Sequence, residues 1–260
     1  MDFSLRYSVL SDSGLRPNNE DAAFAGPRLL ALADGVGGHA AGEIAASIVI
    51  SELAPLDREH VSDPVSVLSK AVARANAAIA RHVEEHPEHR GMATTLTAIL
   101  FAGDHLDLVH IGDSRAYLLR DGSLTQITRD DSLLQSLIES DRIAPEEAWG
   151  HPQRAMVLKV LNGETIDPFL DVRNSRPGDR YLICSDGLSD YVQADSIREM
   201  MTLREPQSCT QELIRLAFMN QSQDNVTCIV AEVVEGDSLY DIAIATTGTT
   251  GVTARLSRIG

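Results

Sequence analysis

Residues 94–120 read TTLTAILFAGDHLDLVHIGDSRAYLLR, and this stretch decides the fold class. It contains three apolar runs joined by tight turns, at residues 95–102, 106–111 and 116–119. Runs of this length and composition are typical of consecutive β-strands. A hairpin turn at Asp121-Gly122 then leads from the third strand into the next one. We therefore expect an antiparallel sheet in the middle of the chain.

Helices and further strands are predicted on both sides of this stretch. The clearest helix has Asp63 as its cap and Pro64 at its first position, and its apolar residues recur every three or four positions as far as Val83. Other helices are predicted at residues 40–53, 132–139 and 206–220, and other strands at 3–10, 28–33, 180–184 and 225–234. Grouped strands and paired helices favour an α+β fold of stacked antiparallel sheets flanked by helices.

The composition is that of an acidic globular protein. Apolar residues make up 43% of the 260 residues, aromatic residues 4%, and the formal net charge is −16. This charge repels polyanions, and few aromatic rings are available for stacking on single-stranded nucleic acid. We therefore expect no nucleic acid partner.

The cysteines and the N-terminus indicate the compartment. Cys184, Cys209 and Cys228 form no CxxC pair, so we expect buried, reduced thiols. Residues 1–19 lack the features of a signal peptide, and no apolar run is long enough to span a membrane. The sequence therefore predicts a cytoplasmic protein with no membrane segment in this chain.

Four aspartates stand in similar contexts far apart along the chain. Each adjoins an apolar run: Asp34 in Ala33-Asp34-Gly35, Asp113 in Gly112-Asp113-Ser114, Asp186 in Ser185-Asp186-Gly187 and Asp224 in Asp224-Asn225-Val226. Each aspartate alone is as well explained as a turn former or a cap, as Asp121-Gly122 shows. Together, carboxylates at strand ends with glycine beside them are what a cluster of hard divalent cations needs.

Such a cluster has a defined chemical use. Cations about 3.5–4 Å apart can activate a water and stabilise an in-line displacement at phosphorus. Asp34 and Asp186 each have two oxygens with which to bridge ions, and no side chain crowds the Gly35 carbonyl. Arg16 has a guanidinium that can hold two phosphate oxygens, although an exposed ion pair is the simpler explanation of an arginine in an acidic loop. His82, His86 and His89 have a spacing that could suit a metal, but we expect a solvated helix end there.

Six motifs occur in one order along the chain: Arg16-Pro17-Asn18-Asn19-Glu20-Asp21, Ala33-Asp34-Gly35-Val36-Gly37-Gly38-His39, Gly91-Met92-Ala93-Thr94-Thr95-Leu96, Gly112-Asp113-Ser114-Arg115, Cys184-Ser185-Asp186-Gly187-Leu188-Ser189-Asp190 and Asp224-Asn225-Val226-Thr227. Together they resemble the metal-dependent Ser/Thr protein phosphatases of the phosphatase 2C type. The resemblance is strongest to bacterial members that oppose Ser/Thr kinases. It implies a four-layer α-β-β-α sandwich, two antiparallel sheets flanked by helix pairs, with a metal cleft at one end.

The resemblance also implies which residues bind metal. Asp34 is expected to bridge two catalytic cations, manganese or magnesium, with the Gly35 carbonyl on one of them. Asp186 and Asp224 are expected to complete the other site. Asp113 is expected to bind a third, weaker cation shared with Asp186. The implied reaction is hydrolysis of phosphoserine or phosphothreonine in proteins by a metal-bound hydroxide, without a phosphoenzyme.

Further residues are expected to support this chemistry. Arg16 is the implied phosphate clamp. Three residues are expected to support the metals and their waters: Glu20, Asp21 and Asn225. A flap at about 136–161 is expected beside the cleft, with His151 and Arg154 facing substrate. The implied partners are phosphorylated Ser/Thr kinases and their protein substrates.

Some positions depart from the family pattern. Val36 stands where some members have a histidine that protonates the leaving group, so the proton donor is expected to be a metal-bound water, while His39 supports the loop. Ala93 replaces a usual glycine, with little expected effect. The catalytic domain is expected over residues 1–236, followed by a flexible, linker-like tail at 237–260; related proteins continue into a membrane anchor.

Three other functions compete with that of an active, kinase-directed phosphatase. A catalytically dead relative that only docks phosphoproteins would not need all four of Asp34, Asp113, Asp186 and Asp224. A different two-metal hydrolase, such as a nuclease, is disfavoured by the net charge of −16. A phosphatase for a regulatory protein of the anti-anti-sigma type is compatible with the same sequence, as are both metals.

Overall fold

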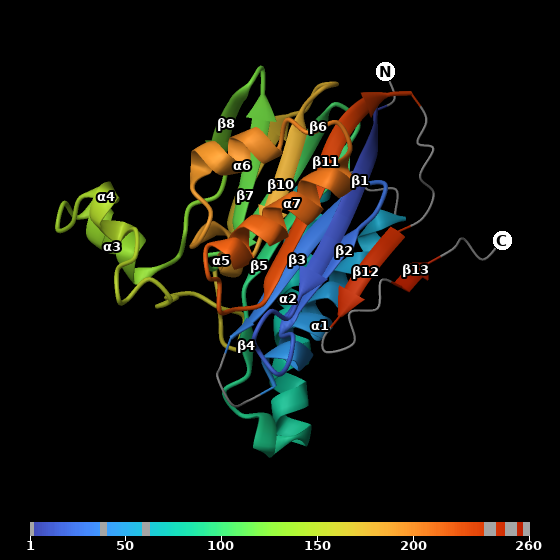
Figure 1. Cartoon of the computed structure of the whole chain (residues 1–260). Helices are drawn as coiled ribbons and strands as arrows, with labels where there is room; N and C mark the ends of the chain where they lie inside the picture. The colour runs from blue at the N-terminus through green and yellow to red at the C-terminus, as the bar shows by residue number, and fades with distance from the viewer. Residues whose placement is uncertain (1–2, 37–40, 59–62, 237–242, 248–253, 257–260) are drawn as a thin grey trace.

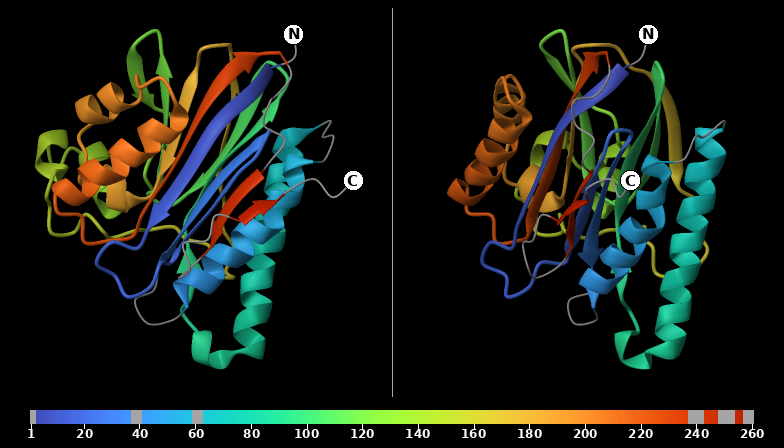
Figure 2. Two further views of the ribbon diagram at one scale, coloured as in Figure 1. Left: turned by 45° about the vertical axis from the view of Figure 1, so that its right-hand side comes forward. Right: turned by 90° about the vertical axis from the view of Figure 1, so that its right-hand side faces the viewer.

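The computed structural model describes residues 3–36, 41–58, 63–236, 243–247 and 254–256. Two antiparallel sheets lie face to face, and helices cover their outer faces (Figure 1, Figure 2). The predicted α+β class and the four-layer α-β-β-α sandwich are both confirmed.

The first sheet has five strands in the order β1-β11-β10-β7-β8. Their bounds are β1 Phe3–Asp12, β7 Arg115–Arg120, β8 Ser123–Gln126, β10 Arg180–Cys184 and β11 Val226–Glu235. Strands β7 and β8 form the predicted hairpin, in which Arg120 pairs with Ser123. Asp121 and Gly122 between them have φ angles of 53° and 78°, and positive values at both positions are what a two-residue type I′ turn requires.

The second sheet has eight strands, in the order β13-β12-β2-β3-β5-β6-β9 with β4 paired to β3. Their bounds are β2 Asp21–Ala25, β3 Leu29–Val36, β4 Ala93–Thr94, β5 Leu96–Ala102, β6 His105–Ile111, β9 Phe169–Asn174, β12 Ala243–Thr247 and β13 Ala254–Leu256. Strand β3 is central and buried on both faces, which explains why residues 29–33 form an unbroken apolar run.

Helices cover both sheets from outside. The second sheet carries α1 (Gly42–Leu53) and α2 (Pro64–Glu85), and the first carries α5 (Asp186–Ser189), α6 (Ala194–Met200) and α7 (Pro206–Met219) (Figure 2). The predicted cap of α2 is present, because Asp63 Oδ1 accepts a hydrogen bond from the Ser66 backbone N–H at 3.2 Å. Short 3-10 turns follow α1 at Ala54–Asp57 and α2 at Pro87–His89. Among the described residues, no helix is long and apolar enough to cross a membrane.

Three apolar cores lie between the four layers. The core between the sheets includes Leu30, Ile99 and Ile183, and another lies between the second sheet and helices α1 and α2. The third core, between the first sheet and α7, contains three fully buried free thiols: Cys184, Cys209 and Cys228. The prediction of buried, reduced cysteines is therefore confirmed, and burial raises the pKa of Cys184 to about 12.

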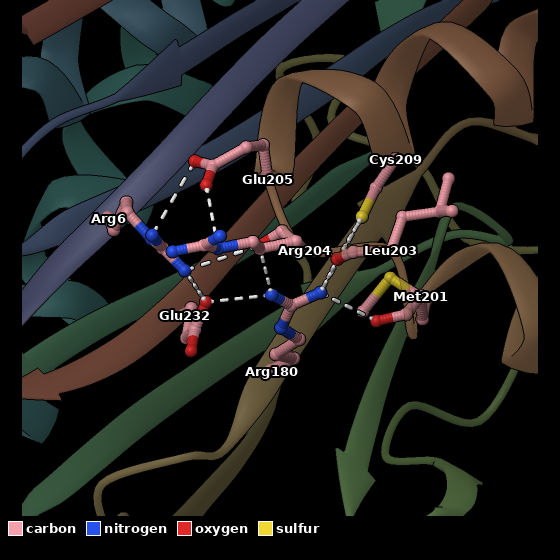
Figure 3. A network of polar contacts seen from close by, with 8 residues as sticks. All are labelled: Arg6, Arg180, Met201, Leu203, Arg204, Glu205, Cys209 and Glu232. Atoms are coloured by element: carbon pink, nitrogen blue, oxygen red, sulfur yellow. Dashed lines mark hydrogen bonds and ion pairs between the residues drawn. The ribbon is translucent and has the colours of Figure 1, made fainter.

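A buried arginine fastens the helical layer to the first sheet (Figure 3). Arg180 on β10 donates hydrogen bonds to the carbonyls of Met201 at 2.8 Å and of Leu203, and to Glu232 Oε2 on β11 at 2.8 Å. Arg6 on β1 also donates to Glu232, at 2.5 Å. Burial raises the pKa of Glu232, but the hydrogen bonds from these two arginines outweigh it and leave that pKa below 4.5. The network thus connects three strands to the α6–α7 connection.

Some elements were not predicted, and one expectation was wrong in part. Strands β2 and β9 and helix α6 were missed, since β2 is rich in alanine and β9 is an edge strand with several exposed residues. The linker-like tail was expected over 237–260, but β12 pairs with β2 and β13 pairs with β12. Main-chain pairing with an open sheet edge needs no apolar pattern, so the linker-like composition of the tail gave no sign of these two strands. The rest of the tail lies outside the described residues.

Candidate active site

Two aspartates meet where β2 begins and β3 ends. The antiparallel register pairs Asp21 directly with Asp34. The Asp34 backbone is held from the other side, because its N–H donates to Thr95 Oγ1 at 3.0 Å and its carbonyl accepts from the Thr95 N–H at 2.9 Å. Ser185 Oγ, from the first sheet, donates to Asp21 Oδ2 at 3.1 Å. The ends of both sheets therefore converge at one point.

The first sheet contributes Asp186 and Asp224 to the same point. Asp186 follows β10 as the first residue of α5, and Asp224 lies two residues before β11. Gly187 packs against the backbone beside them, and a Cβ at this position would lie 2.0 Å from the Asn225 carbonyl oxygen. Glycine is therefore required next to Asp186 for the two segments to approach this closely.

Electrostatics show that these carboxylates surround one another. Burial, followed by repulsion from Asp21, Asp186, Asp113 and Asp224, raises the pKa of Asp34 well above its usual value. Burial, followed by repulsion from Asp113, raises the pKa of Asp186 in the same way. Burial also raises the pKa of Asp21 to about 6. The four aspartates selected from the sequence are thus brought together.

Asp113 lies at the edge of this cluster with two acidic neighbours that the sequence interpretation did not assign. Burial, followed by repulsion from Asp130 and Asp190, raises the pKa of Asp113 to about 7. Arg115 is held by Asp130, with Nε and Nη2 both within 2.9 Å of Oδ2. Asp190 follows Asp186 by one helical turn, a spacing that the motif already contained. Asp130 had no comparable signal, because only the fold brings it near.

Arg16 is held at the rim of the cluster. Its Nη2 donates to Asp224 Oδ2 at 2.9 Å, its Nε donates to the Gln223 carbonyl at 3.1 Å, and its side chain is 55% exposed. The guanidinium therefore retains N–H donors for a ligand at the surface of the cleft. The exposed ion pair, which was the simpler explanation of Arg16, is therefore present, and its role as a phosphate clamp stays a prediction.

Asn225 and Glu20 hold the loop that carries Arg16. Asn225 Oδ1 accepts from the Glu20 N–H at 2.8 Å, and its Nδ2 donates to the carbonyls of Asn18 at 2.9 Å and Ser13 at 3.1 Å. Burial, followed by repulsion from Glu43, raises the pKa of Glu20. Asn225 thus acts on the loop backbone, a contact that the sequence did not reveal.

Gly35 has no room for a side chain. A Cβ there would lie 2.5 Å from the Gly42 carbonyl carbon and 2.7 Å from the Glu20 carbonyl oxygen. The Gly35 N–H donates to that Glu20 carbonyl at 3.2 Å. Val36 pairs with Ala93 at the start of β4. Gly37 to His39 lie outside the described residues, so the expected role of His39 stays a prediction.

The flap borders a cavity of about 240 Å³ that opens beside Asp113 and Asp190. Helices α3 (Leu133–Glu139) and α4 (Pro145–Ala148) form one wall and lie apart from the sheets (Figure 1). Arg154 also lines the cavity and is anchored, with Nε 3.2 Å from Asp190 Oδ2 and Nη2 donating to the Tyr191 hydroxyl at 2.9 Å. His151 accepts from the Gln153 N–H at 3.2 Å and does not line the cavity.

Comparisons with known proteins agree with this geometry. The family described as "Protein phosphatase 2C" matches residues 17–217. The chain belongs to the protein phosphatase 2C family. It is 54% identical over 235 residues to the serine/threonine protein phosphatase PstP of Mycobacterium tuberculosis, which covers 90% of this chain and 46% of that protein. The chain thus spans about half the length of PstP. Protein phosphatase PhpP of Streptococcus pneumoniae is 31% identical over 246 residues, covering 90% of this chain and 100% of that protein.

Solved structures of 2C phosphatases superpose on this chain. The crystal structure of Mycobacterium tuberculosis PstP has a TM-score of 0.87 and 54% identity, and covers 90% of this chain and 100% of that one. A PstP catalytic domain in complex with two manganese ions has a TM-score of 0.85 and 53% identity over the same shares. One solved relative, the PstP catalytic domain, thus holds two manganese ions.

The residues present fit a cluster of hard cations. Buried carboxylates repel one another here, and a divalent cation between them would remove that repulsion. Among the described residues, three ligand atoms within 4.8 Å of one another occur at His86, Glu88 and His89 but not in the cleft. Cations bound in the cleft would therefore complete their shells with water and backbone oxygen, and the Gly35 carbonyl could supply one such oxygen.

Proposed function

We propose that this chain is a protein-serine/threonine phosphatase that uses two or three manganese or magnesium ions. One observation carries the proposal: half-buried Asp34 and Asp186 lie among other carboxylates in a 2C-family fold, at a point where both sheets end. When bound there, divalent cations would supply Lewis acidity and a water of lowered pKa. Asp34, Gly35, Asp186 and Asp224 would hold the catalytic ions, and Asp113 a third one.

The chain's own residues have separate tasks around this cluster. Arg16 would hold two phosphate oxygens at the rim, and its ion pair with Asp224 places it there before substrate arrives. Glu20 and Asp21 would orient water within the cleft. Asn225 fixes the loop that carries Arg16, so it is a positioning residue. Arg154, on the flap, would contact the protein part of the substrate.

The partners follow from the same reasoning. Bacterial Ser/Thr kinases and their phosphorylated substrates are the proposed targets, since PstP and PhpP are named as Ser/Thr or protein phosphatases of bacteria. The net charge of −16 disfavours nucleic acid as a substrate. We propose that the chain acts in the cytoplasm, where such targets lie.

The test is release of phosphate from an autophosphorylated Ser/Thr kinase domain in the presence of manganese. We expect a chelator to abolish the activity, Asp186→Asn to remove it without unfolding the protein, and Arg16→Ala to weaken it mainly by raising KM. Arg198→Ala on α6 is the matched control, an arginine whose side chain is 47% exposed, and should leave the kinetics unchanged. Hydrolysis that resists the chelator would contradict the proposal.

A further inference from the structure

Three imidazole rings gather at the end of α2. His82 lies in the last turn of that helix, His86 is the residue that ends it, and His89 ends the 3-10 turn that follows. The ring centroids of His82 and His86 are 4.6 Å apart, those of His82 and His89 5.1 Å, and those of His86 and His89 5.6 Å. The three imidazole rings therefore form one cluster at this helix end.

Polar contacts connect the rings to each other and to a carboxylate. His82 Nε2 and His89 Nδ1 are 2.9 Å apart, and His86 Nδ1 lies 3.2 Å from Glu88 Oε1. One ligand atom from each of His86, Glu88 and His89 lies within 4.8 Å of the other two. A metal on His89 selects the tautomer in which Nδ1 donates to His82, so that the other nitrogen keeps its lone pair.

The backbone holds this arrangement in place. The His86 N–H donates to the His82 carbonyl at 2.8 Å, and the His89 N–H donates to the His86 carbonyl at 2.9 Å. Pro87 restricts the turn between them. The Met92 N–H then donates to the His89 carbonyl at 3.0 Å, and the Met92 side chain is buried in the core. The carboxyl end of a long helix also favours a bound cation.

We propose that His86, Glu88 and His89 form a second metal site, for a transition metal of the zinc class, with His82 positioning the His89 ring. Two imidazoles and a carboxylate are a ligand set that zinc accepts, leaving one position for water. Imidazole nitrogen prefers zinc, nickel or copper to magnesium or manganese. The site therefore differs in chemistry from the carboxylate cluster of the cleft, where the charges that act on Asp34 and Asp186 come from other aspartates.

The test is calorimetric titration of the whole chain with zinc in excess magnesium, which competes for the carboxylate cleft. We expect wild type to bind one more zinc ion than the His86→Ala/His89→Ala variant. His105→Ala is the matched control, since His105 also lies near two carboxylates, those of Asp104 at 3.5 Å and Asp107 at 3.8 Å. Its titration should equal wild type. Asp34→Asn/Asp186→Asn, which removes cleft ligands, should retain the site.

His82→Ala gives the test of positioning. Loss of such an outer hydrogen bond typically weakens metal binding about 10–100-fold. We expect zinc affinity at the histidine site to fall by about that factor, and to fall further on acidification because ligand imidazoles must be neutral. Equal zinc stoichiometry in wild type and His86→Ala/His89→Ala would overturn the proposal of a metal site. An unchanged zinc affinity in His82→Ala would overturn the positioning role of His82. All the substituted histidines lie on the surface or at a helix end, so circular dichroism should show an unchanged fold.

Discussion

Asp113→Asn is expected to stabilise the metal-free protein. Asp113 is 6% exposed in the connection between β6 and β7, where burial, followed by repulsion from Asp130 and Asp190, raises the pKa of its carboxyl to about 7. Asparagine has nearly the same shape and carries no charge. The substitution therefore removes the cost of burying an anion among anions.

The magnitude and its pH dependence follow from linkage. Because the pKa of Asp113 in the folded state lies above its usual 3.8, the folded protein keeps a proton that the unfolded chain releases. The contribution of the Asp113 carboxyl to the free energy of unfolding is fully present below pH 3.8 and is lost as the pH rises through about 7. Each pKa unit is worth about 1.4 kcal/mol, so Asp113→Asn should gain roughly 2–4 kcal/mol above neutral pH, and the gain should shrink in acid.

Urea unfolding in the presence of a chelator, at about pH 8 and about pH 5, measures this difference. Asp141→Asn is the control. Asp141 is exposed, and its φ of 54° is one that asparagine adopts readily, so this variant should be as stable as wild type at both pH values. Manganese should reduce the difference in free energy of unfolding between wild type and Asp113→Asn, because a bound cation offsets the repulsion between Asp113 and its acidic neighbours. Equal stability at about pH 8, or a gain that persists unchanged in acid, would refute the reasoning.

Three further outcomes are expected. Asp34→Asn should lose several orders of magnitude in manganese-dependent turnover of p-nitrophenyl phosphate while its circular dichroism spectrum stays native; retained turnover would count against its role. Gly187→Ala should cost about 1–3 kcal/mol in urea unfolding, since its Cβ would lie 2.0 Å from the Asn225 carbonyl, and an unchanged midpoint would show that this contact yields easily. Glu232→Gln should lower Tm at neutral pH, and because the pKa of Glu232 lies below 4.5 the difference should close as the pH falls past that value; a constant difference would argue against an ionic contribution.

Local patterns predicted most of the framework. The apolar run at 29–33, within the strand predicted at 28–33, and the Asp121-Gly122 turn both form the structures expected, since a buried strand and a type I′ turn depend on short-range chemistry. Strand β2 was missed because Ala22 and Ala23 have weak strand preference, and only pairing with β3 makes them a strand. Strand β12 was missed for the same reason, since β2 offers it an edge.

The sequence by itself determined which side chains are available for chemistry: aspartates at strand ends, glycines beside them and one arginine near an acidic loop. It could do so because the turn and strand preferences that place them act over a few residues. Only the tertiary structure decided that Asp130 and Asp190 face Asp113 and that Asn225 holds the Arg16 loop. Those contacts join segments that only the pairing and packing of both sheets bring together, and no local preference encodes such a distance.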